Sequence, residues 1–282
     1  MRLCKPHFEI LEQQPGIDGI YKMIELAGRT CYRSEDKITP DSAKGFVDRM
    51  IKSSHLAMLE HGTVYLKVPA GLDSFLDDGW VDCEDIKDSF FSNPYTRIHC
   101  QDGYFYVTTN YRVLVENFAE EYIPDLLQYL CKPTEFHEKR VCVRYVSDIH
   151  FYKDCTRHRV FSWAIESTRF CNYIKSRFGS SVTFATPIWL KNEEQEEFEE
   201  DLKTIESIYF KWINKGWQPQ QAAYFLIQGT KAEIVMTGFV SDYKHFFDLR
   251  SKIAETGEPH PTVVELVEPL RQEFISRGYI ND

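Results

Sequence analysis

Hydrophobic residues along this chain recur at two spacings, one typical of strands and the other of helices. Val64, Leu66 and Val68 occupy alternate positions, which predicts a strand with one buried face. Residues 20–27 place apolar side chains three and four positions apart, as on the buried face of a helix. The two patterns follow one another irregularly. They therefore predict an α+β fold with a largely antiparallel sheet and packed helices.

The elements predicted in this way extend along the whole chain. Strands are expected at residues 8–12, 64–68, 104–109, 141–145, 182–190 and 234–237. Helices are expected at residues 20–32, 40–51, 113–130, 149–159, 198–212, 219–229, 241–250 and 262–277. Thr39 and Ser241 are expected to cap two of the helices, while Pro124 and Pro187 interrupt a helix and a strand.

The composition excludes several classes of protein. The chain carries a formal net charge of −10, and 43% of its 282 residues are hydrophobic, which is sufficient for a sizeable core. The acidic balance argues against a general nucleic-acid coat protein. No apolar run approaches the roughly 20 residues of a membrane span, and residues 1–6 are not followed by an apolar signal region. We therefore expect a cytoplasmic protein that binds neither nucleic acid nor a membrane.

The potential metal ligands do not form a metal-binding pattern. The eight cysteines are scattered without a Cys-x-x-Cys pair, and we interpret them as reduced thiols that mostly fill the core. His55, Glu60 and His61 lie close together in the sequence, but their spacing is not that of the His-Glu-x-x-His zinc motif. No metal site is expected.

One segment reverses the acidic balance of the chain. Between residues 157 and 177, a single acid, Glu166, accompanies six basic residues, namely Arg157, His158, Arg159, Arg169, Lys175 and Arg177. Guanidinium groups hold phosphate or carboxylate through paired, charge-assisted hydrogen bonds. A solvated basic face is the alternative interpretation. The interleaved Phe161 and Trp163 would bury the segment, which favours an anion site because buried arginines need partners.

The same segment carries a specific spacing of residue types. Arg157-His158-Arg159 is followed after seven residues by Ser167, and then by Arg169 and an aromatic residue. This arrangement resembles the characteristic motif of the flavin-dependent thymidylate synthases. Residues 230–238 and 245–250 resemble the C-terminal motif of that family. The resemblance covers most of the chain and implies an α+β homotetramer with active sites between subunits.

The resemblance also implies a reaction. Members of the family convert dUMP to dTMP by reductive methylation, with methylenetetrahydrofolate as the carbon donor and FAD, reduced by NADPH, as the source of hydride. The cofactor then carries the redox chemistry, while the protein orients the reactants. No cysteine nucleophile is required.

Particular residues take roles through the same resemblance. The expected flavin-binding residues are Glu60, His61, Arg157, His158, Arg159 and His245. The expected dUMP-binding residues are Glu166, Ser167, Thr168, Arg169 and Arg250. Arg250 is also the expected catalytic residue, because its charge would stabilise negative charge on the uracil ring. Without the resemblance, Arg250 would be interpreted as a residue that stabilises the end of a helix.

The chain departs from the family at several positions. Residues of about 70–140 form an insertion that shorter members lack, and we expect it to elaborate a single domain comprising residues 1–282. Ala223 occupies the position where the family usually has an arginine for the nucleotide phosphate. Lys231 or a cation from the insertion could compensate. Two alternatives therefore remain: a flavoenzyme that modifies another pyrimidine nucleotide, or an inactive relative that binds nucleotide or flavin.

Overall fold

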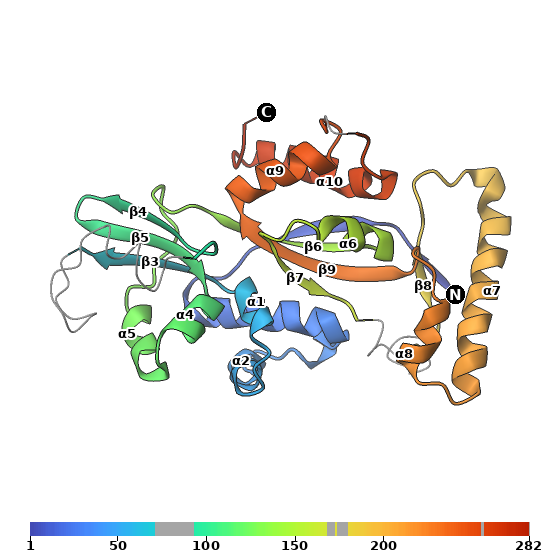
Figure 1. Cartoon of the computed structure of the whole chain (residues 1–282), viewed down its shortest axis with the longest axis horizontal. Coiled ribbons are helices and arrows are strands. Elements are labelled where there is room, and N and C mark those ends of the chain that lie inside the picture. Colours follow the sequence, from blue (N-terminus) through green and yellow to red (C-terminus); the bar gives the residue numbers. More distant parts are fainter. Residues whose placement is uncertain (71–92, 168–172, 174–179, 255–256, 282) are drawn as a thin grey trace.

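The fold is organised around a four-stranded antiparallel sheet, seen edge-on in Figure 1. The computed structural model describes residues 1–70, 93–167, 173, 180–254 and 257–281. The order in the sheet is β2-β6-β9-β7, and the bounds of the strands are His7–Leu11, Arg140–Asp148, Lys231–Phe239 and Ser162–Ile165 respectively. The two long strands pair over their whole length, from Arg140 opposite Phe239 to Asp148 opposite Lys231.

The two faces of this sheet are covered by different helices. Alternate residues of β6, such as Val143 and Tyr145, face α6 (Ile149–Cys155), α9 (Val240–Arg250) and α10 (Pro261–Ser276). The intervening residues, such as Cys142, face α1 (Gly16–Tyr32). Figure 1 shows α9 and α10 above the sheet and α1 below it. The direction of a side chain therefore decides which layer it enters.

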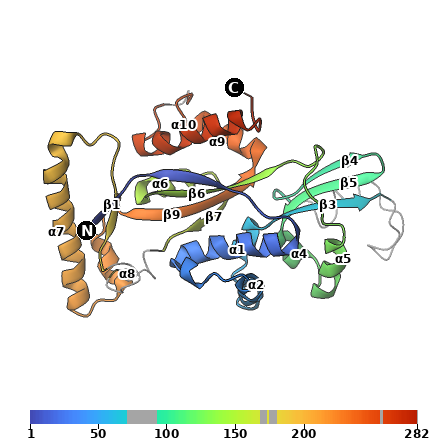
Figure 2. The same cartoon turned by 180° about the vertical axis from the view of Figure 1, so that it is seen from behind.

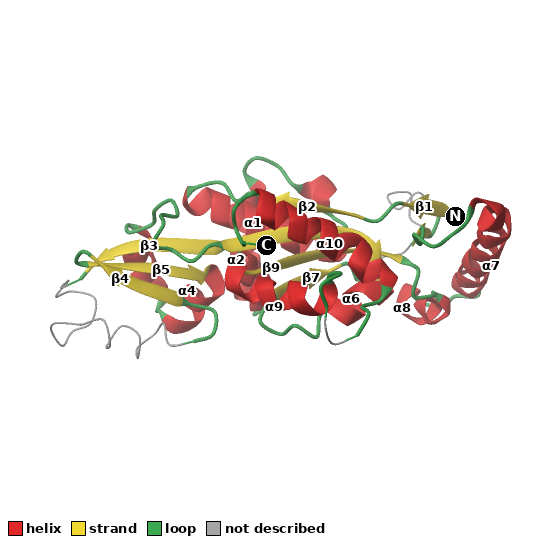
Figure 3. Cartoon of the chain, turned by 90° about the horizontal axis from the view of Figure 1, so that it is seen from above, coloured by secondary structure: helices red, strands yellow, loops and turns green. Residues whose placement is uncertain are grey.

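A second sheet continues the first at one end. Its order is β3-β5-β4, with bounds Thr63–Pro69, Tyr104–Asn110 and Arg97–Gln101. Its core packs against α1 and the helices α2 (Ser42–Lys52), α4 (Tyr111–Asn117) and α5 (Ile123–Leu127). Short 3-10 helices lie at Glu35–Lys37, Leu56–His61 and Glu120–Tyr122. Figure 3 shows this sheet extending away from the central one.

The opposite end of the molecule carries a smaller cluster. Strands β1 (Arg2–Cys4) and β8 (Thr183–Ala185) pair in parallel, and the long helix α7 (Gln195–Asn214) packs beside them. The short helix α8 (Pro219–Ala222) lies next to α7, as the reverse view in Figure 2 shows. Two 3-10 helices complete this end, at Asn192–Glu194 and Ala223–Phe225. Residues near the N-terminus thus pack with residues about 180–226.

These elements confirm the α+β fold and the predominance of antiparallel pairing, but several predicted boundaries are wrong. The helix predicted at 149–159 ends at Cys155, so it does not include the Arg-His-Arg motif. The strand predicted at 182–190 stops at Ala185, before Pro187. The helix predicted at 219–229 ends at Ala222, and the one predicted at 113–130 is divided into separate short helices. Strands β1, β4 and β7 were not predicted.

The predicted helix caps are also wrong. The helix expected from Pro40 begins at Ser42, whose hydroxyl accepts a hydrogen bond from the Thr39 backbone N–H. The helix expected from Ser241 begins at Val240, because the Ser241 hydroxyl donates a hydrogen bond to the Glu138 carboxylate. Cys100 is disulfide-bonded, so the expectation of reduced thiols is wrong for this residue. Within the described ranges, no helix is long and apolar enough to cross a membrane.

Candidate functional site

The Arg157-His158-Arg159 motif forms a turn between α6 and β7. His158 is only 9% exposed, while both arginines are exposed to solvent. The turn is held by its backbone: the His158 N–H donates to Cys155 O over 3.0 Å, and Trp163 Nε1 donates to His158 O over 3.3 Å. Neither arginine forms a hydrogen bond or ion pair with the described residues. Two free guanidinium groups therefore flank a buried imidazole.

Helix α9 brings His245 and Arg250 to the same place. The rings of His158 and His245 are 6.0 Å apart, and Phe246 packs edge-on against His158 at 5.0 Å. Arg250 is anchored by two backbone carbonyls, with its NH1 3.1 Å from Leu249 O and its NH2 3.4 Å from Asp154 O. Its buried Nε has no hydrogen-bond partner. Five predicted residues thus form one cationic group.

This environment keeps His158 neutral. Burial, followed by the charge of Arg250 and then that of His245, lowers the pKa of His158 from 6.5 to about 4. The ring can therefore donate one hydrogen bond and accept one at neutral pH, while Arg157, Arg159 and Arg250 supply positive charge. Such a group suits a ligand that carries both anionic and polar ring atoms.

Glu60 and His61 lie in a different place, at the end of the 3-10 helix before β3. His61 is fully buried, with its Nδ1 2.8 Å from Thr237 Oγ1. Burial, and next the charge of Arg140, lowers the pKa of His61 to about 3. Glu60 Oε1 is 2.6 Å from Arg112 NH1. In this chain, therefore, His61 is neutral and the Glu60 carboxylate already has a cationic partner.

Glu166 and Ser167 form a third group, directly after β7. The Glu166 side chain is 1% exposed, and its Oε2 is 2.9 Å from Lys231 Nζ. Its other oxygen, Oε1, lies 3.6 Å from Arg33 Nε and has no hydrogen-bond partner. The Ser167 N–H donates to Cys31 O over 2.9 Å. Thr168 and Arg169 lie outside the described residues.

The three groups do not meet within one chain. His158 and Arg250 pack on the face of the sheet that α9 covers, since His158 contacts Phe246 in that core. Glu166 pairs with Arg33, which follows α1 on the other face. Glu60 and His61 lie beside Thr237, away from the Glu166 end of β9. The sheet therefore separates His158, His245 and Arg250 from Glu166.

An ion-pair network around Glu166 was only partly anticipated. Lys231 contacts Glu233 as well as Glu166, and Glu233 also contacts Arg144, whose NH2 is 3.6 Å from Glu35 Oε1. Burial alone would raise the pKa of Glu233, but Lys231 and Arg144 outweigh it and lower that pKa to about 2. A signal was present in the sequence, because Lys231 and Glu233 alternate directly before the strand predicted at 234–237, and a longer strand would place both on one face.

The expected compensation for Ala223 is not supported by this geometry. Ala223 begins a 3-10 helix next to the exposed Tyr224, and Lys231 already pairs with the buried Glu166 and the partly buried Glu233. No group of three His, Cys, Asp or Glu side chains that could hold a metal ion occurs in the described part of the chain.

The fold and these groups define an α+β protein with buried neutral histidines and exposed guanidiniums that suit an anionic ligand. The sequence matches the model of one family, Thymidylate synthase complementing protein, over residues 108–274. Since this match includes more than half of the 282 residues, the chain belongs to that family. The match begins within residues 70–140, so it includes part of the expected insertion.

Comparisons with individual proteins identify further similarities. The chain is 25% identical to a flavin-dependent thymidylate synthase from Pyrococcus furiosus over 154 residues, which represent 51% of this chain and 59% of that relative. Two crystal structures of the UMP/dUMP methylase PolB from Streptomyces cacaoi, with bound 5-Br dUMP and 5-Br UMP, align with TM-scores of 0.45 and 0.44. Their sequences are 12% and 11% identical to this chain. Each alignment covers 98% of this chain, and the alignments cover 93% and 92% of the two PolB chains respectively.

Proposed function

We propose that this protein methylates dUMP at C5 to give dTMP in the cytoplasm. Methylenetetrahydrofolate is the proposed carbon donor, with FAD as the cofactor and NADPH as its reductant. Membership of the family carries this proposal. The cationic group of Arg157, Arg159 and Arg250 supports it, because the proposed cofactor and substrate are both phosphorylated.

The residues of this group fit a flavin dinucleotide. Arg157 and Arg159 are exposed and without partners among the described residues, so they are free to bind a pyrophosphate. The neutral imidazole of His158 and the exposed ring of His245 would contact the polar edge or face of the isoalloxazine. When bound, the flavin would supply the hydride that completes the methyl group.

Two side chains, those of Arg250 and Glu166, are proposed to bind the nucleotide and to stabilise its reacting form. Arg250 has a buried Nε without a hydrogen-bond partner, so it retains a donor for an oxygen of the uracil ring. Its fixed charge would stabilise the negative charge that develops on the ring as C5 attacks the carbon donor. Glu166 would accept a hydrogen bond from the nucleotide through Oε1, which has no hydrogen-bond partner. Ser167, Thr168 and Arg169 are proposed to bind beside it.

The proposed protein is a homotetramer whose active sites include residues of more than one subunit. The separation of Glu166 from His158 and Arg250 by the central sheet supports this arrangement. Mixing an Arg250→Ala variant with a Glu166→Gln variant tests it. If each site takes these residues from different chains, subunit exchange restores some activity to two inactive preparations. A monomer, or a mixture without any recovery, would contradict shared sites.

The direct test is formation of dTMP by purified protein. The protein is supplied with dUMP, methylenetetrahydrofolate, FAD and NADPH, and the products are separated by chromatography. We expect dTMP only when all four are present. Omission of FAD from flavin-free protein and omission of the folate serve as controls. If NADPH is oxidised but no dTMP forms, the methylation proposal fails.

The position of Ala223 favours a second candidate, in which another pyrimidine nucleotide is methylated. Lys231, the nearest expected substitute for the phosphate arginine, is held by Glu166 and Glu233. A panel of dUMP, UMP, dCMP and deoxyuridine distinguishes the candidates. If dUMP has the highest kcat/KM, the second candidate is excluded. If deoxyuridine is as good a substrate as dUMP, recognition of the phosphate is not part of this site.

A further inference from the structure

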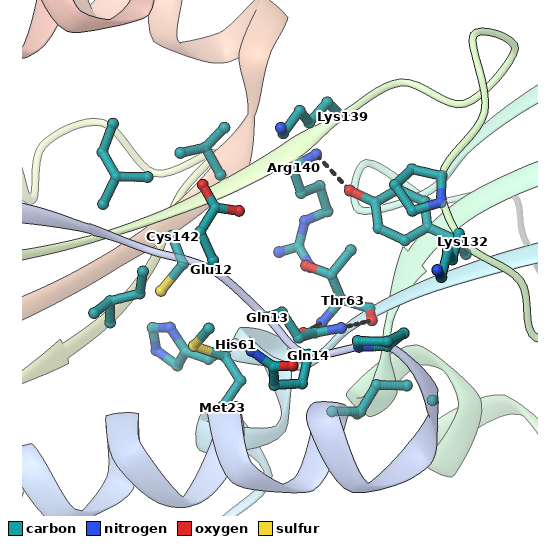
Figure 4. Close-up of a pocket in the computed structure, with 18 of the residues that line it drawn as sticks. Glu12, Gln13, Gln14, Met23, His61, Thr63, Lys132, Lys139, Arg140 and Cys142 are labelled. Atoms are coloured by element: carbon teal, nitrogen blue, oxygen red, sulfur yellow. Dashed lines mark hydrogen bonds between the residues drawn. The ribbon is translucent and has the colours of Figure 1, made fainter. Parts of the chain in front are cut away.

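A cavity of about 400 Å³ lies beside α1 at the edge of the central sheet, away from His158 and Arg250. It is enclosed by residues 10–16, the start of β3, residues 130–133 and the start of β6 (Figure 4). The apolar part of its lining includes Ile20 and Met23 of α1, together with Ile10 and Val141 from the other face of the sheet. A volume of this size is sufficient for a small organic molecule, since ligand pockets occupy roughly 300–1,000 Å³.

Arg140, the first residue of β6, supplies a buried positive charge to this cavity. It is 7% exposed, and Figure 4 shows its side chain directed towards Thr63. Its NH2 donates to Glu60 O over 3.1 Å, while its NH1 reaches Thr63 Oγ1 and Thr109 O only over 3.4 and 3.5 Å. These two contacts are longer than the usual limit of about 3.2 Å. The buried Nε has no hydrogen-bond partner.

Within the described ranges, no carboxylate forms an ion pair with this charge, although the charge of Glu60 favours it from a longer distance. Among the described residues, none lies within ion-pair distance of Arg140. Burial lowers the pKa of Arg140, which shows that its surroundings oppose the charge. An arginine remains protonated in a protein, so an unpaired buried guanidinium persists at a cost in free energy. An anion that entered the cavity would remove that cost.

The rest of the lining is also cationic. Lys139 and Lys132 contribute to the cavity wall, and Lys132 forms no hydrogen bond or ion pair with the described residues. Glu12 is the one acid that lines the cavity, and its Oε1 is 2.8 Å from Arg277 NH1. Among the described residues that line the cavity, the one carboxylate therefore has a cationic partner, which it shares with Glu273, although the chain as a whole carries a net charge of −10.

The cavity has a fixed wall. Gln13 bonds the backbone of Thr63 twice: its Nε2 donates to Thr63 O, and its Oε1 accepts from Thr63 N, each over 2.8 Å. His61, which lines the inner side, is neutral because burial lowers its pKa to about 3. The positive charge of the wall therefore comes from Arg140 and the two lysines, and not from a titrating histidine.

We propose that this cavity binds a small molecule with an apolar body and a single carboxylate, and that the carboxylate pairs with Arg140. The Nε edge of the guanidinium provides the unused donors, and this edge matches the two oxygens of a carboxylate. One buried cation balances one negative charge, which favours a monoanion over a doubly charged phosphate. The apolar wall around Ile20 and Met23 receives the body. The proposal does not depend on the reaction proposed above.

Benzoate is a suitable probe, and benzamide is its uncharged counterpart of the same shape. Binding is measured by isothermal titration calorimetry with purified, FAD-supplemented protein at constant ionic strength, and inorganic phosphate is titrated in parallel. Arg140→Met removes the charge and retains an apolar side chain of similar length. Lys132→Gln removes an exposed charge without affecting the core. Lys203→Gln, on the distant helix α7, is the matched control.

We expect benzoate to bind with at least tenfold higher affinity than benzamide or phosphate. Arg140→Met should reduce benzoate affinity about tenfold or more, and Lys132→Gln by a smaller factor, while Lys203→Gln has no effect. If Arg140→Met fails to fold, the proposal is still tested by the comparison of benzoate with benzamide and by the effect of Lys132→Gln on benzoate affinity. Equal affinities for benzoate and benzamide, or stronger binding of phosphate, would overturn the proposal. Unchanged benzoate binding in a folded Arg140→Met variant would also overturn it.

Discussion

Lys231 and Glu166 form a buried ion pair that joins the end of β7 to the beginning of β9. The Lys231 Nζ lies 2.9 Å from Glu166 Oε2, and the two side chains are 8% and 1% exposed. The Glu233 N–H also donates to Glu166 Oε2, over 3.1 Å. The carboxylate is therefore held by a side chain and a backbone group from the same strand. This relationship fixes Glu166, a predicted substrate-binding residue, before any substrate is present.

Lys231→Met should strongly destabilise the protein. The substitution leaves Glu166 and Glu233 without their shared cation, and removal of one partner from a buried pair costs about 3–5 kcal/mol. Chemical denaturation at pH 7 measures the loss. The matched control is Lys44→Met, because Lys44 pairs with Asp48 at 2.9 Å but is 72% exposed. That variant should lose much less stability, because solvent screens an exposed ion pair. Equal losses would show that burial of the Lys231 pair has no energetic consequence.

Arg250→Met should raise the pKa of His158. After burial, the positive charge of Arg250 is the main cause that lowers this pKa to about 4. Removal of the charge makes the imidazolium less unfavourable, so the ring should titrate closer to 6.5. NMR titration of the imidazole signals, assigned with a His158→Gln variant, measures the shift. Arg277→Met is the control, and an unchanged His158 titration in Arg250→Met would place the two residues too far apart to interact.

Arg250→Ala should reduce turnover much more than flavin retention, if the proposed reaction is correct. Loss of one fixed donor that stabilises charge in a transition state costs about 10²–10³-fold in kcat. Activity is measured as dTMP formation, and retention as the flavin absorbance after gel filtration. Arg277→Ala should change neither. An equal loss of turnover and flavin would assign Arg250 a structural role.

Arg157→Ala and Arg159→Ala should weaken flavin binding without unfolding the protein. Both side chains are exposed and lack partners among the described residues, so removal should change stability by less than about 0.5 kcal/mol. A charged hydrogen bond to a phosphate contributes about 1.5–3 kcal/mol, which corresponds to roughly tenfold or more in affinity. Fluorescence titration with FAD measures the change. Unaltered affinity in both variants would remove them from the flavin site.

The sequence was sufficient to predict the central elements because each has a strong local pattern. Val141, Val143 and Tyr145 alternate in the centre of the sheet, and the long apolar face of residues 198–212 lies within α7. Strand β7 was missed because Phe161 and Trp163 were interpreted only as residues that bury the basic segment. In fact Trp163 lies in this short edge strand, and Phe161, which directly precedes the strand, packs against Tyr243 of α9. Tertiary packing overrode the local preference there.

The candidate site was predictable in its residues but not in its arrangement. The residues His158, His245 and Arg250 were selected by resemblance, and the structure does bring them together. Glu166 faces the other layer because side chains alternate between the two faces along β7. Since this strand was not predicted, the face on which Glu166 lies could not be predicted either. Arg140 was not selected, because its burial follows from the packing of β3 and β6 and leaves no local pattern. The position of Glu166 and the burial of Arg140 both depend on contacts between residues that are distant in the sequence.

The contribution of Glu233 to stability should disappear in acid. Its pKa in the folded protein is about 2, below the ordinary value of 4.5, because Lys231 and Arg144 outweigh the opposing effect of burial. A carboxyl group with a lowered pKa stabilises the folded state above its unfolded pKa, and this stabilisation is lost as the pH falls towards the folded value. The wild type should therefore exceed Glu233→Gln by about 3 kcal/mol near pH 7, since each pKa unit corresponds to about 1.4 kcal/mol. This difference should shrink progressively between about pH 4.5 and pH 2.

Urea denaturation across this pH range measures the difference in stability, with the exposed Glu196→Gln on α7 as the control. A difference that stays constant with pH would mean that the charge of Glu233 does not stabilise the fold.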